Sequence, residues 1–182
     1  MATHVHIPRN VIALWIFWMT AAGAAFAQDR RDTRLADEVG RTVRQYSRFT
    51  IFDDVNGQVE GGVVTLQGKV TMPHKKTEIE RRVARIDGVR ELKSRIEVLP
   101  VSQFDEDLRR RVARAIYGSP SFWNYAAMAN PPIHIVVENG RVTLTGVVSN
   151  EVERMLARSL ATGLGELVVS NELRTEAELK SY

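Results

Sequence analysis

Residues 137–148 read Val-Glu-Asn-Gly-Arg-Val-Thr-Leu-Thr-Gly-Val-Val, and this stretch decides the fold because the chain contains it twice. The earlier copy, residues 59–70, reads Val-Glu-Gly-Gly-Val-Val-Thr-Leu-Gln-Gly-Lys-Val, and at an offset of 78 eight of the twelve positions are identical. The identical pairs are Val59/Val137, Glu60/Glu138, Gly62/Gly140, Val64/Val142, Thr65/Thr143, Leu66/Leu144, Gly68/Gly146 and Val70/Val148. A constant offset indicates a tandem repeat of one structural unit.

Each copy has the pattern of a β-hairpin. The dipeptides Asn139-Gly140 and Gly61-Gly62 accept a positive φ at both turn positions, as a type I′ turn requires. After the second turn, Val142 and Leu144 alternate with threonines, which gives the strand one apolar and one polar face. We therefore predict two hairpins, each covered on one side only.

Three conspicuous features are interpreted as structural rather than chemical. Gly68 and Gly146 recur inside a predicted strand, where glycine costs stability, so we expect a bulge or a close approach of another backbone segment. The adjacent acids Asp53-Asp54 have no third metal ligand nearby in the sequence and are interpreted as loop or strand-edge residues. His134 stands alone on a strand face, so no ligand role is predicted for it.

Residues 1–27 have the pattern of a signal peptide. Arg9 precedes an uncharged run from Val11 to Phe26, and Ala25-Phe26-Ala27 offers the small residues that signal peptidase accepts. The run is shorter than a membrane-spanning helix requires, and an uncleaved N-terminal helix is the alternative. No cysteine follows the run, which argues against lipoprotein attachment here. We predict export to the periplasm, with cleavage after Ala27.

Composition narrows the class of protein. Removing 27 of the 182 residues leaves 155, enough for two small domains. The remaining 24 basic and 22 acidic residues give a net charge of about +2, which is not the signature of a nucleic-acid partner. Because the chain has no cysteine, thiol chemistry and thiolate metal sites are excluded, and each domain depends on packing alone.

The first domain is predicted over residues 31–99. Apolar residues at helical spacing predict a helix from Asp32 to Arg48 with one buried face. The residues expected on that face are Leu35, Val39, Val43 and Tyr46. A second helix is expected from Lys75 to Ile86 and a last strand from Glu91 to Leu99. The fold class is therefore α+β, each domain being a three-stranded mixed sheet packed on two helices in the order αββαβ.

The second domain is predicted over residues 102–175, followed by a flexible tail over residues 176–182. The linker Leu99-Pro100-Val101 is so short that we expect the two domains to touch. Ser102 is suited to cap the next helix. The residues expected on its buried side are Phe104, Leu108, Val112, Ala115 and Ile116. The closing helix, capped by Asn150, is expected to bury Val152, Leu156 and Leu160.

An aromatic insertion interrupts the second domain. Phe122, Trp123 and Tyr125 lie within four residues, after a helix that carries Arg110 and Arg114. Tryptophan and tyrosine favour the headgroup level of a membrane, and arginines reach phosphates, so the insertion could form an interfacial anchor. The alternative is that Phe122 and Tyr125 close the core of a small domain. Full burial is less expected for the larger Trp123.

With the repeat laid out, both halves resemble BON (bacterial OsmY and nodulation) domains. The motifs that carry the resemblance are Gly-Val-Val-Thr-Leu-Gln-Gly-Lys-Val at 62–70, Ile-Asp-Gly-Val at 86–89, the stretch 131–148, and Val-Ser-Asn-Glu-Leu at 169–173. Residues 164–167, Leu-Gly-Glu-Leu, depart from the Gly-Val common in the family, so that turn is expected to differ. The resemblance implies a non-enzymatic periplasmic protein similar to OsmY-like hyperosmotically inducible proteins, with phospholipid binding proposed for the module and no shared catalytic residues.

The function predicted from these observations is binding of anionic phospholipid or another envelope surface, in osmotic or envelope stress. Trp123, Phe122 and Tyr125 would supply apolar contacts, and Arg110 and Arg114 would contact phosphates. The alternative is a periplasmic protein-interaction or stress-protective module that binds no lipid. No catalytic residue, cofactor or metal is predicted, because the chain has no paired acid and base, nucleophile and base, or metal-ligand spacing.

Overall fold

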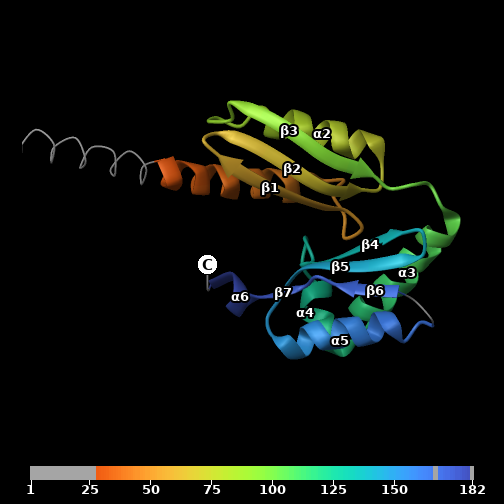
Figure 1. Cartoon of the computed structure of the whole chain (residues 1–182). Coiled ribbons are helices and arrows are strands. Elements are labelled where there is room, and N and C mark those ends of the chain that lie inside the picture. The colour runs from red at the N-terminus through yellow and green to blue at the C-terminus, as the bar shows by residue number, and fades with distance from the viewer. Residues whose placement is uncertain (1–27, 166–167, 181–182) are drawn as a thin grey trace, which may run out of the picture.

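The structure, a computed structural model, describes residues 28–165 and 168–180. The predicted signal peptide and part of the atypical turn at 164–167 lie outside these residues. Two α+β domains follow one another along the chain and stack with a short connection between them (Figure 1). Each contains its own sheet and its own hydrophobic core, so the predicted tandem architecture is confirmed.

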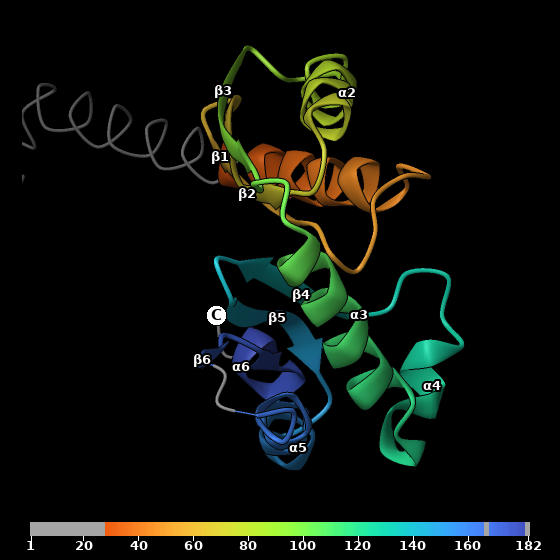
Figure 2. The same ribbon diagram turned by 90° about the vertical axis from the view of Figure 1, so that its right-hand side faces the viewer.

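The first domain has the predicted order of elements. Its helical segment over residues 28–44 is followed by β1 (Asp54–Glu60), β2 (Val63–Val70), α2 (Pro73–Val83) and β3 (Glu91–Val98). The central strand β2 pairs antiparallel with β1 and parallel with β3, so the sheet is mixed. Both helices lie on one face of the sheet (Figure 2). The four residues predicted to line the first helix, Leu35, Val39, Val43 and Tyr46, are buried there.

The second domain repeats this plan with additions. The repeated elements are α3 (Gln103–Tyr117), β4 (Ile133–Glu138), β5 (Arg141–Val148), α5 (Glu151–Thr162) and β6 (Val168–Asn171). The additional elements are η1 (Pro120–Phe122), α4 (Trp123–Ala126), β7 (Arg174–Thr175) and α6 (Glu176–Lys180). The central strand β5 pairs antiparallel with β4 and parallel with β6 and β7. The two domains therefore share one topology.

The repeated hairpin explains why the two sheets have the same geometry. Asn139 and Gly140 have φ angles of 51° and 75°, as the type I′ turn requires. A Cβ added to Gly146 would overlap the carbonyl oxygen of Pro132, which confirms a close backbone approach inside the strand. The turn is also held from the side, since Asp105 of α3 accepts hydrogen bonds from the amides of Asn139 and Gly140 at 2.9 and 2.8 Å.

Two predictions about the second core are wrong. Phe104, expected to be buried, is 61% exposed, because the first turn of α3 lies at the hairpin turn, beyond the apolar face of the sheet. Val152, in the first turn of α5, is 74% exposed. Ala157 and Ala161 are the buried residues of α5 instead, and their small side chains allow this helix to pack closely on the core.

The C-terminal segment is more structured than the predicted flexible tail. Residues 176–180 form α6, and Glu178 in that helix accepts a hydrogen bond from the backbone amide of Thr175 at 2.7 Å. Arg154 of α5 contacts the same carboxylate at 2.9 Å. These contacts attach α6 to the second domain.

Candidate functional site

The aromatic insertion does not form one exposed patch. Phe122 is fully buried in the core of the second domain, so its predicted role as a lipid contact is wrong. Phe122 is the last residue of η1, the short turn that follows α3, and this turn directs its side chain into the core. Its ring lies 6.0 Å from the ring of Tyr125, measured between centroids.

Tyr125 connects the insertion to the closing helix. Its hydroxyl donates to Glu153 at 2.7 Å and accepts from the backbone amide of Ser149 at 3.0 Å. We call these three residues the Tyr125 cluster. Burial raises the pKa of Tyr125, and the bond to the Glu153 carboxylate raises it further. The cluster fixes α4 beside the start of α5.

Trp123 is the aromatic residue of the insertion that faces outward. It begins α4 and is 72% exposed, and Met128 shortly after it is 47% exposed. The insertion packs beside the C-terminal end of α3 (Figure 2). The structure thus places one large indole and one flexible thioether on the outer surface of the second domain.

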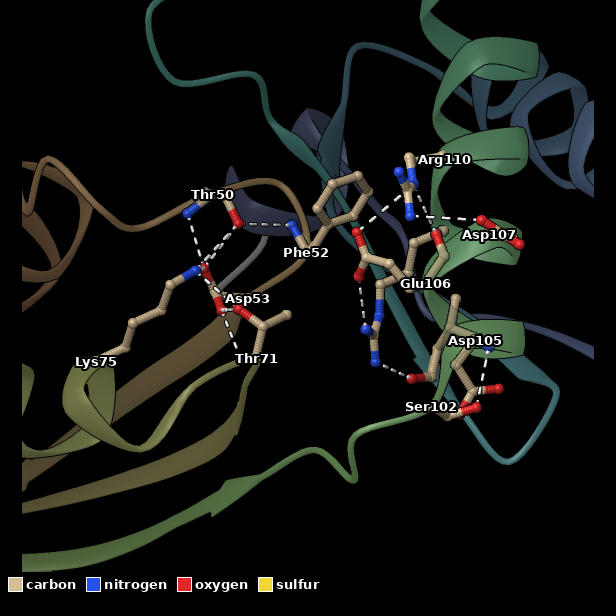
Figure 3. Close-up of polar contacts among 12 residues, drawn as sticks. Thr50, Phe52, Asp53, Thr71, Lys75, Ser102, Asp105, Glu106, Asp107 and Arg110 are labelled. Carbon is tan, nitrogen blue, oxygen red and sulfur yellow. Dashed lines mark hydrogen bonds and ion pairs between the residues drawn. The ribbon is translucent and has the colours of Figure 1, made fainter.

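The arginines of α3 lie in three different environments. Arg109 is buried and donates to the carbonyl of Val137 at 2.8 Å. Arg110 is exposed but lies 3.6 Å from the carboxylate of Glu106 and 3.4 Å from that of Asp107 (Figure 3). Arg114, in the last turn, is exposed and has no ion-pair partner within the described residues. Of the two predicted phosphate contacts, Arg114 is therefore the less neutralised.

The first domain contains a buried polar centre that the sequence did not predict. Asp53 is fully buried and contacts the Lys75 ammonium at 2.5 Å (Figure 3). Its carboxylate also accepts from the amides and hydroxyls of Thr50 and Thr71, at distances of 2.8 to 2.9 Å. We call these four residues the Asp53 cluster. Asp53 lies in the loop directly before β1, as predicted, but its burial and its pairing with Lys75 were not predicted.

Electrostatics explain why a carboxylate is stable there. Burial raises the pKa of Asp53, but hydrogen bonds from Lys75, Thr71 and Thr50 outweigh burial, and the net pKa is below its ordinary value. The charge is thus paired and fully hydrogen-bonded, the condition under which a buried ion is tolerated. The cluster fixes the loop that precedes β1.

This loop makes the principal contact between the domains. The amide of Ile135, on the edge strand β4, donates to the carbonyl of Ile51 at 2.7 Å. Ile51 and Phe52 pack against the core of the second domain. Lys69 of β2 also forms an ion pair with Glu138 of β4. As the short linker predicted, the domains touch.

A cleft of about 700 Å³ lies at this junction. Its walls come from residues 49–56 of the first domain, which span the loop before β1 and the start of β1, and from the 129–134 segment, β5 and β7 of the second. The ring of Phe49 lies 5.5 Å from that of His134, between centroids, and forms part of the wall. The sequence could not have indicated this site, because its lining is assembled from both domains.

Neither a metal-binding group nor a membrane-spanning helix is found in the part of the chain that the structure describes. Within residues 28–165 and 168–180, no three His, Cys, Asp or Glu side chains gather as a metal-binding group. In the same part of the chain, no helix has the length and apolar character needed to cross a bilayer. The buried Asp53–Lys75 pair is enclosed by hydrogen bonds, and neither residue is part of the cleft lining, although Thr50 of the same cluster is.

Comparison with known protein families gives one match for each of the two domains. The sequence profile described as BON domain matches residues 31–100 and 104–177. Two solved structures of CdsD, a structural protein of the type III secretion system of Chlamydia trachomatis, resemble the chain. The first, of the CdsD C-terminal domain, shares 14% identity over 78% of this chain and 65% of that one, with a TM-score of 0.33. The second shares 16% identity over 82% and 67%, with a TM-score of 0.32.

This chain thus spans about two thirds of the length of the two CdsD chains. No curated protein sequence gives a significant match.

Proposed function

The chain belongs to the BON domain family, and we propose that it is a non-enzymatic, exported envelope protein that binds anionic phospholipid through its second domain. BON domains are associated with envelope and periplasmic proteins and with phospholipid binding, and the family is non-catalytic. In this proposal residues 1–27 are removed on export to the periplasm. Binding would serve the protein in osmotic or envelope stress.

The exposed indole of Trp123 is the observation that carries the proposal. A side chain of this size is usually largely buried, yet 72% of it is exposed. Tryptophan prefers the headgroup region of a bilayer, where its ring is apolar and its N–H is hydrated. Arg114 lies at the adjoining end of α3 and can form bidentate hydrogen bonds with a phosphate. Together they suit the surface of an anionic membrane.

The other predicted residues have supporting roles in this proposal. Phe122 anchors the insertion in the core, and the Tyr125 cluster holds α4 in place. Arg110 contributes less than Arg114, because Glu106 and Asp107 already share its charge.

The rival function is a protein-interaction module that binds through an exposed sheet edge. β3 forms one edge of the first sheet. Four of its eight residues are charged: Glu91, Lys93, Arg95 and Glu97. Charged residues on an edge strand oppose the addition of another strand. This observation argues against the addition of a strand at β3.

Sedimentation with vesicles tests the proposal. The chain processed after Ala27 is mixed with neutral phosphatidylcholine vesicles, or with vesicles that also contain phosphatidylglycerol, at low and at moderate salt. We expect sedimentation with the anionic vesicles only, weakening as salt rises, because screening reduces contacts between arginine and phosphate. Absence of sedimentation at both salt concentrations would reject the lipid-binding function and support a protein partner.

A variant of Trp123 and a matched control test the role of Trp123 in vesicle binding. Trp123→Ala removes the proposed apolar contact from an exposed position, so we expect it to weaken vesicle binding several-fold and to change stability by less than about 0.5 kcal/mol. Phe104→Ala is the control, since Phe104 is also an exposed aromatic residue of the second domain but lies at the hairpin turn. Equal binding by the Trp123→Ala variant and the unmodified protein would refute the assignment of Trp123.

A further inference from the structure

The outer edge of the second sheet is closed by groups from other elements. β4 is the edge strand, and the hydroxyl of Tyr117 accepts from the amide of Ile133 at 3.2 Å and donates to its carbonyl at 2.5 Å. The loop before β1 holds the amide of Ile135, and Arg109 donates to the carbonyl of Val137 at 2.8 Å. An additional strand would therefore find this edge already occupied.

The first helix of the chain aligns with α3 at an offset of 73 residues. Asp32 accepts hydrogen bonds from the amides of Gly61 and Gly62 at the first hairpin turn, which is the role of Asp105 at the second turn. Three pairs of buried apolar residues have the same offset: Leu35/Leu108, Val39/Val112 and Val43/Ile116. Positions in the two helices can therefore be compared one by one.

At this offset both side chains that close β4 are replaced. Arg109 corresponds to Ala36, and Tyr117 corresponds to Arg44. Ala36 has no hydrogen-bonding side chain, and the Arg44 guanidinium makes no hydrogen bond or ion pair within residues 28–165 and 168–180. In the same part of the chain, β1 (Asp54–Glu60) has no backbone hydrogen bonds except those of its ladder with β2. The equivalent edge of the first sheet is thus open.

This open edge is also accessible. By equivalence with residues 133, 135 and 137, its outward backbone groups belong to Val55, Gly57 and Val59. Gly57 has no side chain, so its exposure is that of the backbone itself. The cleft of about 700 Å³ opens at the start of β1, where Val55 and Asn56 line it. An extended segment would find free hydrogen-bonding groups along this edge.

We propose that β1 binds an extended segment of a partner protein as an added strand, and that this segment carries basic residues. Asp54 and Glu60 are the charged residues of β1, and neither has an ion-pair partner in the described part of the chain. They are six residues apart, so both side chains leave the same face of the sheet. Lysines or arginines at the same spacing in the added strand would lie opposite both acids.

The same charges argue against a second copy of the chain as the occupant. If two β1 strands paired antiparallel about Gly57, Asp54 of each strand would lie opposite Glu60 of the other. Like charges directly opposite each other on neighbouring strands are destabilising. Because β1 belongs to the first domain, this binding is independent of vesicle binding through Trp123 in the second.

Hydrogen exchange with two peptides tests the proposal. One is acetyl-Thr-Lys-Val-Thr-Val-Thr-Val-Lys-Thr-amide, and the other has glutamate in place of both lysines. At millimolar lysine peptide we expect slower exchange at the amides of Val55, Gly57 and Val59, since the amides between them already bond to β2. The glutamate peptide should bind about tenfold more weakly.

Three results would overturn the proposal. The first is no saturable protection of these alternate amides with either peptide, and the second is equal affinity for the two peptides. The third is the same protection without peptide, increasing with protein concentration, which would identify a second copy of the chain as the occupant.

The variant Glu60→Lys tests the charge at an exposed position of β1. The fold should be kept, and affinity for the lysine peptide should fall about fivefold, because an attraction becomes a repulsion. Glu91→Lys is the control, since it changes the net charge equally at an exposed position of β3, the opposite edge of the same sheet. Equal affinities in the two variants would also overturn the proposal.

Discussion

Where the central strand is followed by a helix, the two domains place side chains of opposite charge at equivalent positions. At the start of α2, Lys75 is buried against the carboxylate of Asp53. At the offset of 78, the equivalent residue of α5 is Glu153, which accepts a hydrogen bond from the hydroxyl of Tyr125. The repeated backbone thus places a polar side chain at the same position near the start of the helix, whereas the partner that each domain supplies determines the charge of the contact, its burial and its sensitivity to pH.

The largest effect is expected from breaking the contact in the first domain. Asp53→Ala leaves the Lys75 ammonium buried without a carboxylate, which should lower the free energy of unfolding of that domain by about 3–5 kcal/mol. Urea unfolding, followed by residue-resolved hydrogen exchange to separate the domains, measures it. Asp54→Ala, at the neighbouring half-buried acid, is the control and should cost far less. Equal losses in both variants would contradict the assignment of the Asp53 cluster.

The second prediction concerns pH: the first domain should lose stability in acid, and the second domain should lose stability in alkali. The folded pKa of Asp53 lies below its ordinary value of 3.8, so its contribution is present above that pH and is lost as pH falls through the folded pKa. The folded pKa of Tyr125 lies above its ordinary value of 10.0, so its contribution is lost as pH rises above 10.0. Burial also raises the pKa of Tyr117, which adds to the alkaline loss.

Hydrogen exchange and thermal unfolding across pH would reveal this divergence. We expect the first domain to weaken first in acid and the second to weaken first in alkali. In Asp53→Asn the acid sensitivity of the first domain should diminish. If both domains lost stability together at each extreme, the two clusters would not account for the pH dependence.

A smaller effect is expected from the second domain's contact. Tyr125→Phe removes the hydrogen bonds to Ser149 and Glu153 and keeps the ring, so the free energy of unfolding should fall by about 1–1.5 kcal/mol. Tyr46→Phe is the control, because the Tyr46 hydroxyl makes no hydrogen bond among the described residues, although its ring lies under Arg82. A Tyr125→Phe variant as stable as this control would show that the Tyr125 cluster contributes no stability.

Much of the fold could be predicted from the sequence because its signals are local. The repeated turn dipeptides and the strand alternation predict the hairpins, and the apolar positions of the first helix predict its buried face. Phe104 and Val152 were wrongly expected to be buried, because periodicity shows which way a residue points but not where the neighbouring sheet ends. Both errors fall in the first turn of a helix.

The candidate sites were harder to predict because they depend on tertiary contacts. Asp53 and Lys75 are 22 residues apart, and no sequence pattern connects them. In the aromatic insertion the short turns have no periodicity, so the sequence could not distinguish the buried Phe122 from the exposed Trp123. The cleft near His134 exists only where two domains meet.

The fluorescence of Trp123 tests the central claim most directly. The other two tryptophans, Trp15 and Trp18, lie in the predicted signal peptide, so Trp123 is the sole tryptophan of the processed chain. Adding anionic vesicles at low salt should shift its emission to shorter wavelength as the indole leaves water, and neutral vesicles should not. Unchanged emission under conditions in which the protein sediments with the vesicles would contradict binding through Trp123.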